Sequence, residues 1–176
     1  MDFRDITIDN IDLRKKTKNS YDILYNNTNL EFYTILLFCP FGLEEKYNNY
    51  FINFQIENID TNKNTIDTHK NTIDNDFYDF LIKLELNIKT LVNNLEKSDY
   101  NINSQINKKS NMLYTKLIHK NKKILCKFTN NENENLNIYK LEKKKYYFCK
   151  LNCDSLWISN NIIYFKYKIK EIKLNN

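Results

Sequence analysis

The 176-residue sequence has no alanine and only one glycine, one proline, one valine and one tryptophan. In their place it uses asparagine, lysine, isoleucine, tyrosine and phenylalanine, residues whose codons are rich in A and T. Nucleotide bias therefore accounts for much of the composition, so the raw numbers of Lys or Asn say little about function. A chain of this length most simply forms one domain with its own core.

Long apolar runs are missing as well. The longest, residues 34–39, has the length of a strand and is far shorter than the ~18–20 apolar residues that cross a bilayer. The N-terminus also lacks the pattern of a signal peptide. We therefore expect an intracellular protein without a membrane partner.

The sequence also lacks the motifs of common catalytic and metal sites. There is no Cys-x-x-Cys pair and no glycine-rich phosphate loop, and paired carboxylates such as Glu44–Glu45 lie among polar residues. Cys149 and Cys153 could bind zinc together with His119, but an intracellular cysteine is more often a small buried hydrophobic residue. We expect no metal, no cofactor and no catalytic residue.

Charge is unevenly distributed along the chain. Residues 1–107 carry 11 Lys and Arg against 17 Asp and Glu, a net charge of −6, whereas residues 108–176 carry 16 against 5, a net charge of +11. Codon bias does not readily produce such an asymmetry. The basic second half therefore favours a polyanionic partner.

The C-terminal stretch from Leu156 to Lys170 has the clearest pattern. After a Ser-Asn-Asn turn, residues alternate with the period of a strand, placing Ile163, Phe165, Tyr167 and Ile169 on one face and Tyr164, Lys166, Lys168 and Lys170 on the other. The apolar positions then shift to Ile172 and Leu174, which predicts a bulge near Lys170–Glu171. The polar face is either a solvated strand surface or a nucleic-acid groove.

Most other segments read as strands. We expect strands at Ser20 to Tyr25, Leu30 to Phe38, Tyr47 to Ile56, Leu113 to Ile118, Lys123 to Phe128 and Tyr146 to Leu151. Residues 1–19 are expected to form an N-terminal arm and a basic linker, and residues 20–176 a single domain. The sole proline and sole glycine, Pro40 and Gly42, indicate a special backbone shape between two strands.

Residues 76–96 predict a long amphipathic helix with one apolar stripe. Glu85 and Lys89 are expected to form an outward pair on this helix. Residues 58–75, which contain a repeated Lys-Asn-Thr-Ile-Asp, are expected to form a low-complexity surface loop. The strands and helix together predict a β-rich α+β fold, compatible with an OB-like barrel that carries one helix between its strands.

Several short motifs, in the same order, resemble the single-stranded DNA-binding proteins of nucleocytoplasmic large DNA viruses, OB-fold relatives of the phage replication proteins. They are Tyr25-Asn26-Asn27, Cys39-Pro40-Phe41-Gly42, Tyr50 to Phe54, Phe77-Tyr78-Asp79-Phe80-Leu81, Tyr114 to Ile118, Leu156-Trp157-Ile158 and Tyr164 to Ile169. The resemblance spans about residues 20–174. This chain departs from the family in having a single tryptophan and no acidic C-terminal tail.

The resemblance implies sequence-tolerant binding of single-stranded DNA in viral replication or repair, in the host cytoplasm, the nucleus or a viral factory. We expect phosphates on Lys166, Lys168 and Lys170, helped by Lys116, Lys120, Lys122 and Lys123, and bases on Tyr164 and Tyr114. Trp157 is expected to anchor the core or its rim. RNA, a second copy of the chain and replication proteins stay open as partners. The alternative is a non-catalytic virion or host-interaction protein that keeps the fold without the nucleic-acid site.

Overall fold

The computed structural model describes residues 1–56, 68–121 and 123–175. Its strands are β1 (Ile11–Thr17), β2 (Ser20–Tyr25), β3 (Thr28–Tyr33), β4 (Leu37–Cys39), β5 (Leu43–Lys46), β6 (Asn49–Gln55), β7 (Asn101–Ile102), β8 (Ile106–Asn107), β9 (Met112–Leu117), β10 (His119–Lys120), β11 (Lys123–Ile124), β12 (Lys127–Thr129), β13 (Lys145–Cys153), β14 (Ser155–Ser159), β15 (Ile162–Phe165) and β16 (Tyr167–Leu174). The helix α1 (Thr68–Glu96) lies between β6 and β7, and 3-10 turns cover Phe3–Asp5, Ile8–Asn10 and Ile138–Lys140.

Five strands close into a barrel. β16 pairs with β9, β9 with β6, β6 with β4, β4 with β13, and β13 pairs again with β16. The β9–β16 pair is parallel and the other four are antiparallel. This closed barrel with a helix between its strands confirms the OB-like fold that the sequence predicted.

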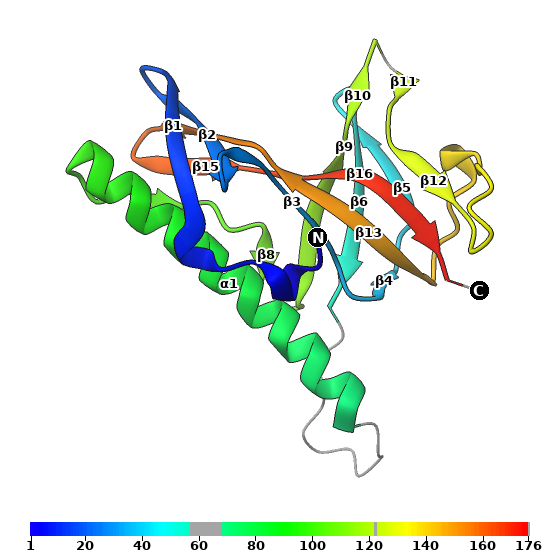
Figure 1. Cartoon of the computed structure of the whole chain (residues 1–176). Coiled ribbons are helices and arrows are strands. Elements are labelled where there is room, and N and C mark those ends of the chain that lie inside the picture. The colour runs from blue at the N-terminus through cyan, green and yellow to red at the C-terminus, as the bar shows by residue number, and fades with distance from the viewer. Residues whose placement is uncertain (57–67, 122, 176) are drawn as a thin grey trace.

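A second sheet is joined to the barrel through β13. The first part of β13 pairs with β4 and its last part with β3, and from β3 the sheet continues through β2, β14, β15 and β7, with β1 on β2. In the view of Figure 1 the β1–β2 and β10–β11 hairpins point to the same side, with α1 on the other. The residues expected to form a basic linker thus belong largely to β1, which pairs with β2 along its length.

Asparagine takes the role of the missing glycines in the tight turns. The β2–β3 turn has positive φ at Asn26 and Asn27, and the β14–β15 turn at Asn160 and Asn161. Two successive residues with positive φ make the two-residue turn that matches the twist of a hairpin, and asparagine tolerates this conformation better than most side chains. Gly42, at φ +78°, supplies the special backbone expected next to Pro40.

The alternation along the last strand is confirmed, with its bulge. Ile163, Phe165, Tyr167, Ile169 and Ile172 are buried. On β13, Lys150 pairs with Glu171 and the next residue, Leu151, pairs with Ile169, so the register skips Lys170. This extra residue is a β-bulge, which shifts the alternation by one and keeps Lys173 on the outward face.

The apolar stripe of α1 packs into the common hydrophobic core. Phe77, Phe80, Leu81, Leu84, Ile88 and Val92 are buried, whereas Leu95 is exposed. The Phe80 ring lies 5.2 Å from that of Phe32 on β3 and 5.5 Å from that of Phe3. Residues 58–67 of the expected loop lie outside the described residues, whereas the assignment of residues 68–75 to that loop is wrong, because the helix begins at Thr68. Among the described helices, none is both long and apolar enough to cross a membrane.

Three expected strands are divided in the structure. The alternating segment after the Ser-Asn-Asn turn forms β15 and β16, which separate at Lys166. The segment from Leu30 to Phe38 forms β3 and β4, which separate at residue 34, where the Thr34 hydroxyl accepts a hydrogen bond from the Cys149 amide at 3.0 Å. The segment from Lys123 to Phe128 forms β11 and part of β12. β11 pairs with β10 in a small hairpin, whereas β12 pairs with β16. A local apolar pattern cannot reveal such a change of partner strand.

The expected outward pair of Glu85 and Lys89 is wrong. The loop after α1 folds back over this side of the helix, so that Glu85 is 4% exposed. Its carboxylate accepts a hydrogen bond from the backbone N–H of Gln105 at 3.0 Å. Lys89 pairs instead with Asp99, at 3.4 Å. Burial raises the pKa of Glu85 above its usual value of 4.5, although hydrogen bonds from Ser104 and Gln105 act in the opposite direction.

This burial makes a prediction for stability. Because the pKa of Glu85 is higher in the folded chain than in the unfolded chain, its contribution to the free energy of unfolding falls as pH rises from 4.5 through the raised pKa. Glu85→Gln keeps an acceptor oxygen and removes the charge, so we expect a higher melting temperature at pH 7.5 and little difference at pH 4.5. Thermal unfolding followed by circular dichroism at both pH values measures this.

Glu85→Ala is the matched variant, because it leaves the buried backbone N–H of Gln105 without its acceptor. It should lower the free energy of unfolding by about 1–3 kcal/mol. A Glu85→Gln protein destabilised as much as Glu85→Ala at pH 7.5 would contradict the prediction.

Candidate nucleic-acid interface

The outward face of β9 and β16 brings predicted phosphate contacts together. Lys168 on β16 lies directly opposite Lys116 on β9. The residues that flank both lysines along their strands are buried or partly buried, and Tyr167 and Ile169 belong to the core. The two side chains therefore point away from the barrel on one face, with Lys166 one alternation earlier on the same chain.

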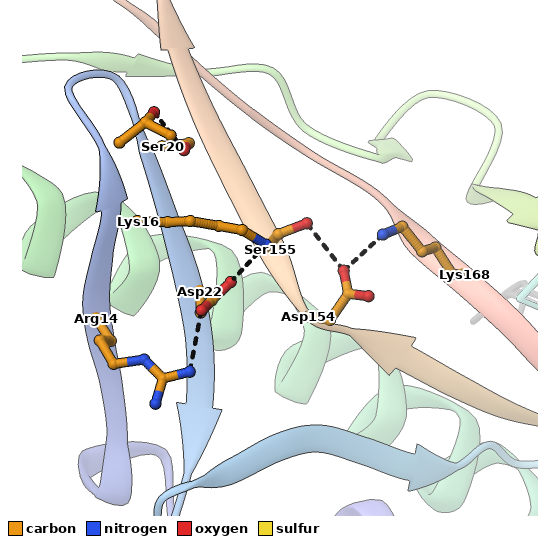
Figure 2. A network of polar contacts seen from close by, with 8 residues as sticks. Arg14, Lys16, Ser20, Asp22, Asp154, Ser155 and Lys168 are labelled. Carbon is orange, nitrogen blue, oxygen red and sulfur yellow. Dashed lines mark hydrogen bonds and ion pairs between the residues drawn. The ribbon is translucent and has the colours of Figure 1, made fainter.

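Two of the three predicted lysines of the last strand already have carboxylate partners. The Lys168 ammonium lies 2.6 Å from Asp154, which also accepts a hydrogen bond from the Ser155 hydroxyl (Figure 2). Lys170 pairs with Glu31 on β3. Burial acts to raise the pKa of Glu31, but the ammonium groups of Lys170 and Lys150 hold it below its usual value. The ladder of lysines is thus partly neutralised within the fold.

Lys116 and Lys166 are different, because neither has a carboxylate partner among the described residues. The Lys166 ammonium donates a hydrogen bond to the neutral Gln105 side chain at 2.8 Å. Burial lowers the pKa of Lys116, with a further contribution from Lys168, and burial together with the charge of Lys116 lowers the pKa of Lys166. These two partly desolvated cations repel one another, and a bound anion would supply their missing counter-charge.

An exposed aromatic ring lies beside these two lysines. Tyr114 on β9 is 40% exposed and lies opposite Asn53 on β6. With Phe51, Asn53, Gln105, Thr115, Lys166, Glu44 and Lys46 it lines a cavity of about 240 Å³. A neighbouring cavity of about 220 Å³ is lined by Lys116, Leu117, Ile118, His119, Asp154 and Lys168. Two hollows of this size next to unpaired ammonium groups suit flat bases joined to phosphates.

Tyr164, the other predicted stacking residue, already has a stacking partner. Its ring lies 5.4 Å from that of Trp157, directly across the β14–β15 hairpin and inclined by 12°. Trp157 is 44% exposed, so of the two expected places, the core and its rim, the core is excluded. The alternation of Leu156 and Ile158 with Trp157 was the signal that should have placed the indole on the opposite face of the strand.

The network of ion pairs continues on the second sheet. Asp22 on β2 binds Arg14 at 3.1 Å and Lys16 at 3.3 Å, both from β1, and Asp22 lies opposite Ser155 on β14. Figure 2 shows this cluster on one side of β14 and the Asp154–Lys168 pair on the other. Acidic side chains therefore neutralise the cations on both sides of β14, in contrast with Lys116 and Lys166.

The remaining predicted lysines lie at the β10–β11 hairpin, next to the end of β9. Lys120 and Lys123 face each other in register and both are exposed, whereas Lys122 lies outside the described residues. His119 packs edge-on against Tyr50, with ring centroids 5.8 Å apart. The hairpin extends the strand that carries Tyr114 and Lys116.

No group of three or more His, Cys, Asp and Glu side chains that could hold a metal is found in the described part of the chain. Cys39, Cys149 and Cys153 are buried, and burial raises the pKa of the Cys39 thiol to about 11. These thiols are therefore protonated at neutral pH, as expected for small core residues.

Sequence reasoning missed Phe51, Asn53, Gln105 and Trp157 as members of this face. The sequence patterns assigned no role to Phe51, Asn53 or Gln105. The register of β6 against β9 places Phe51 opposite Lys116 and Asn53 opposite Tyr114. Such neighbours across strands more than 50 residues apart leave no local signal in the sequence.

Comparison with known proteins identifies a similar fold. No protein-family model matches the chain, and no curated protein matches it. A single-stranded DNA-binding protein from bacteriophage Enc34, solved with a C-terminal truncation, superposes with a TM-score of 0.51 over 97% of both chains, at 9% sequence identity. At this identity the similarity concerns the fold, and it agrees with the OB-like barrel and its single long helix between strands.

Proposed function

We propose that the chain binds single-stranded DNA with little sequence preference and without catalysing a reaction. The observation that carries this proposal is the Lys116–Lys166 pair, two partly desolvated cations without a carboxylate, beside the exposed ring of Tyr114. Phosphates would neutralise the pair, and bases would stack on the ring, which is how sequence-tolerant single-strand binding works. The fold shared with a phage protein named for this activity supports the same function.

The roles of the individual residues follow from their surroundings. Lys116 and Lys166 would hold phosphates directly, whereas Lys168 and Lys170 would share their charge with Asp154 and Glu31. Tyr114 would stack on one base, and the pair formed by the exposed Trp157 and the partly buried Tyr164 on another. Lys120 and Lys123 on the β10–β11 hairpin would contact the backbone beyond Lys116, and Lys122, which lies outside the described residues, stays a predicted contact.

A role in the replication or repair of a large DNA virus is the finer proposal. It rests on the ordered motifs from Tyr25 to Ile169, and the phage origin of the structural neighbour is compatible with it. Single-stranded RNA could use the same phosphate and stacking contacts, since these do not depend on the 2′-hydroxyl.

The alternative, an interaction protein that has kept the fold and lost the nucleic-acid site, has one observation in its favour. Lys168 and Lys170 are neutralised by acids of the same chain, as expected of a solvated structural face. The unpaired Lys116 and Lys166 are what this alternative leaves unexplained.

Removing the unpaired cations should weaken both affinity and its salt dependence. For Lys116→Met/Lys166→Met we expect a lower affinity for oligo-dT and a log–log salt slope smaller by about 1.4, since each phosphate contact contributes ~0.7 on a single strand. Fluorescence anisotropy with labelled oligo-dT over a salt series measures both quantities.

Lys83→Met/Lys97→Met makes the same change of charge at two exposed positions, one on α1 and one just after it, and should leave the slope at its wild-type value. Equal slopes in the wild type and in the Lys116→Met/Lys166→Met protein would rule out this phosphate contact.

Removing the aromatic rings should weaken binding in a different way. Tyr114→Ala and Trp157→Ala are each expected to cost about 1–3 kcal/mol of binding free energy while leaving the salt slope unchanged, because stacking releases no counter-ions. The same titration at one fixed salt concentration measures the loss. Tyr139→Ala removes an exposed tyrosine outside this face and serves as the control. Wild-type affinity in both test variants would exclude stacking at these positions.

A further inference from the structure

A larger cavity lies at the other end of β16. It has a volume of about 510 Å³ and is lined by side chains of β3, β12, β13 and β16, among them Tyr33, Phe148, Lys127, Lys150, Glu171 and Lys173. Figure 1 shows β12, β16 and β13 side by side near the C-terminus, and their registers agree with this arrangement. The interface described above does not include it.

The bulge at Lys170 connects this cavity with the first site. Without the extra residue, strict alternation after Lys168 would turn Ile172 outward and Lys173 into the core. With it, Ile172 is 1% exposed and Lys173 pairs with Phe148 on the outward face. Lys166, Lys168, Lys170 and Lys173 therefore follow one another along the outside of the strand over roughly 23 Å, at ~3.3 Å per residue.

Two aromatic rings of this cavity are open to solvent. Tyr33 is 42% exposed and Phe148 is 39% exposed, although Phe32 on β3 and Tyr147 on β13 are fully buried. The Lys150 ammonium lies 5.7 Å from the centroid of the Tyr33 ring, within the range of a cation–π contact. Flat rings beside ammonium groups repeat the chemistry of Tyr114 and Lys166.

The charges of the cavity leave two lysines available. Lys150 is bound by Glu31 at 3.1 Å and approached by Glu171 at 4.0 Å. Lys173 has only a long contact to the Asn133 side chain, at 3.4 Å, and within the described ranges neither Lys127 nor Lys173 forms an ion pair. The site thus combines two exposed rings with two unneutralised cations.

We propose that the Tyr33–Phe148 cavity is a second subsite for the same single strand. One or two bases would stack on Tyr33 and Phe148, and their phosphates would lie on Lys127 and Lys173. Lys168 and Lys170 would lead the backbone from the first site to the second. This inference rests on the proposed function, and it adds that a longer strand follows β16 around the barrel instead of ending at Lys168.

Length dependence separates the two sites. Oligo-dT of 4 to 16 nucleotides covers the range that one OB fold occupies. For Tyr33→Ala/Phe148→Ala we expect wild-type affinity for the shortest oligonucleotides that bind. The affinity for the longest should fall by about tenfold or more, because only these reach the second subsite. Anisotropy titrations across the series, with melting curves to verify folding, measure this.

Phe41→Ala/Tyr139→Ala removes the same two ring types from exposed positions elsewhere and should keep the wild-type length dependence. Lys127→Met/Lys173→Met leaves the rings in place and should reduce the salt slope for long oligonucleotides only. Identical length dependence in the wild type and in both test variants would overturn the second subsite while leaving the first intact. A wild-type protein that binds none of the oligonucleotides would overturn the proposed function as well.

Discussion

The pairing of β16 with both β9 and β13 is the constraint on which the rest of the structure depends. This one strand closes the barrel, buries Tyr167 and Ile169 in its core, and carries three outward lysines, Lys168, Lys170 and Lys173. Because side chains alternate along a strand, burying the apolar set fixes the direction of the polar set. The bulge at Lys170 then adjusts the alternation, so that the outward face stays basic to the end of the strand.

Electrostatic pairing divides this face into two kinds of lysine. Lys168 and Lys170 sit against Asp154 and Glu31, and such contacts hold side chains in place while contributing little net charge. Lys116 is held by β9 and Lys166 by its hydrogen bond to Gln105, and among the described residues neither has a carboxylate partner. Glu85, on the helix, accepts a hydrogen bond from the backbone N–H of Gln105. The long helix between strands therefore also positions the loop whose Gln105 side chain orients Lys166. The first subsite is thus a product of the barrel and the helix together.

Sequence patterns predicted what depends on local periodicity. The alternation from Ile163 to Ile169, the bulge, the Asn26–Asn27 turn and most of the apolar stripe of α1 all follow from spacing along the chain. The order of the elements was compatible with an OB-like barrel, and the family resemblance implied it. What could not be predicted depends on residues far apart in sequence. Glu31 reaches Lys170 across 139 residues, Gln105 reaches Lys166 across 61, and the loop after α1 covers Glu85. Nothing in the local pattern indicates which lysines would be neutralised.

The most direct measurement is a titration of the unmodified protein with labelled oligo-dT at two salt concentrations, alongside duplex DNA of equal length. We expect tighter binding of the single strand and a steep loss of affinity with salt, at ~0.7 of a log–log slope unit for each phosphate that a lysine neutralises. Absence of binding at low salt, or equal binding of the duplex, would contradict single-strand recognition by this face and would leave only the fold established.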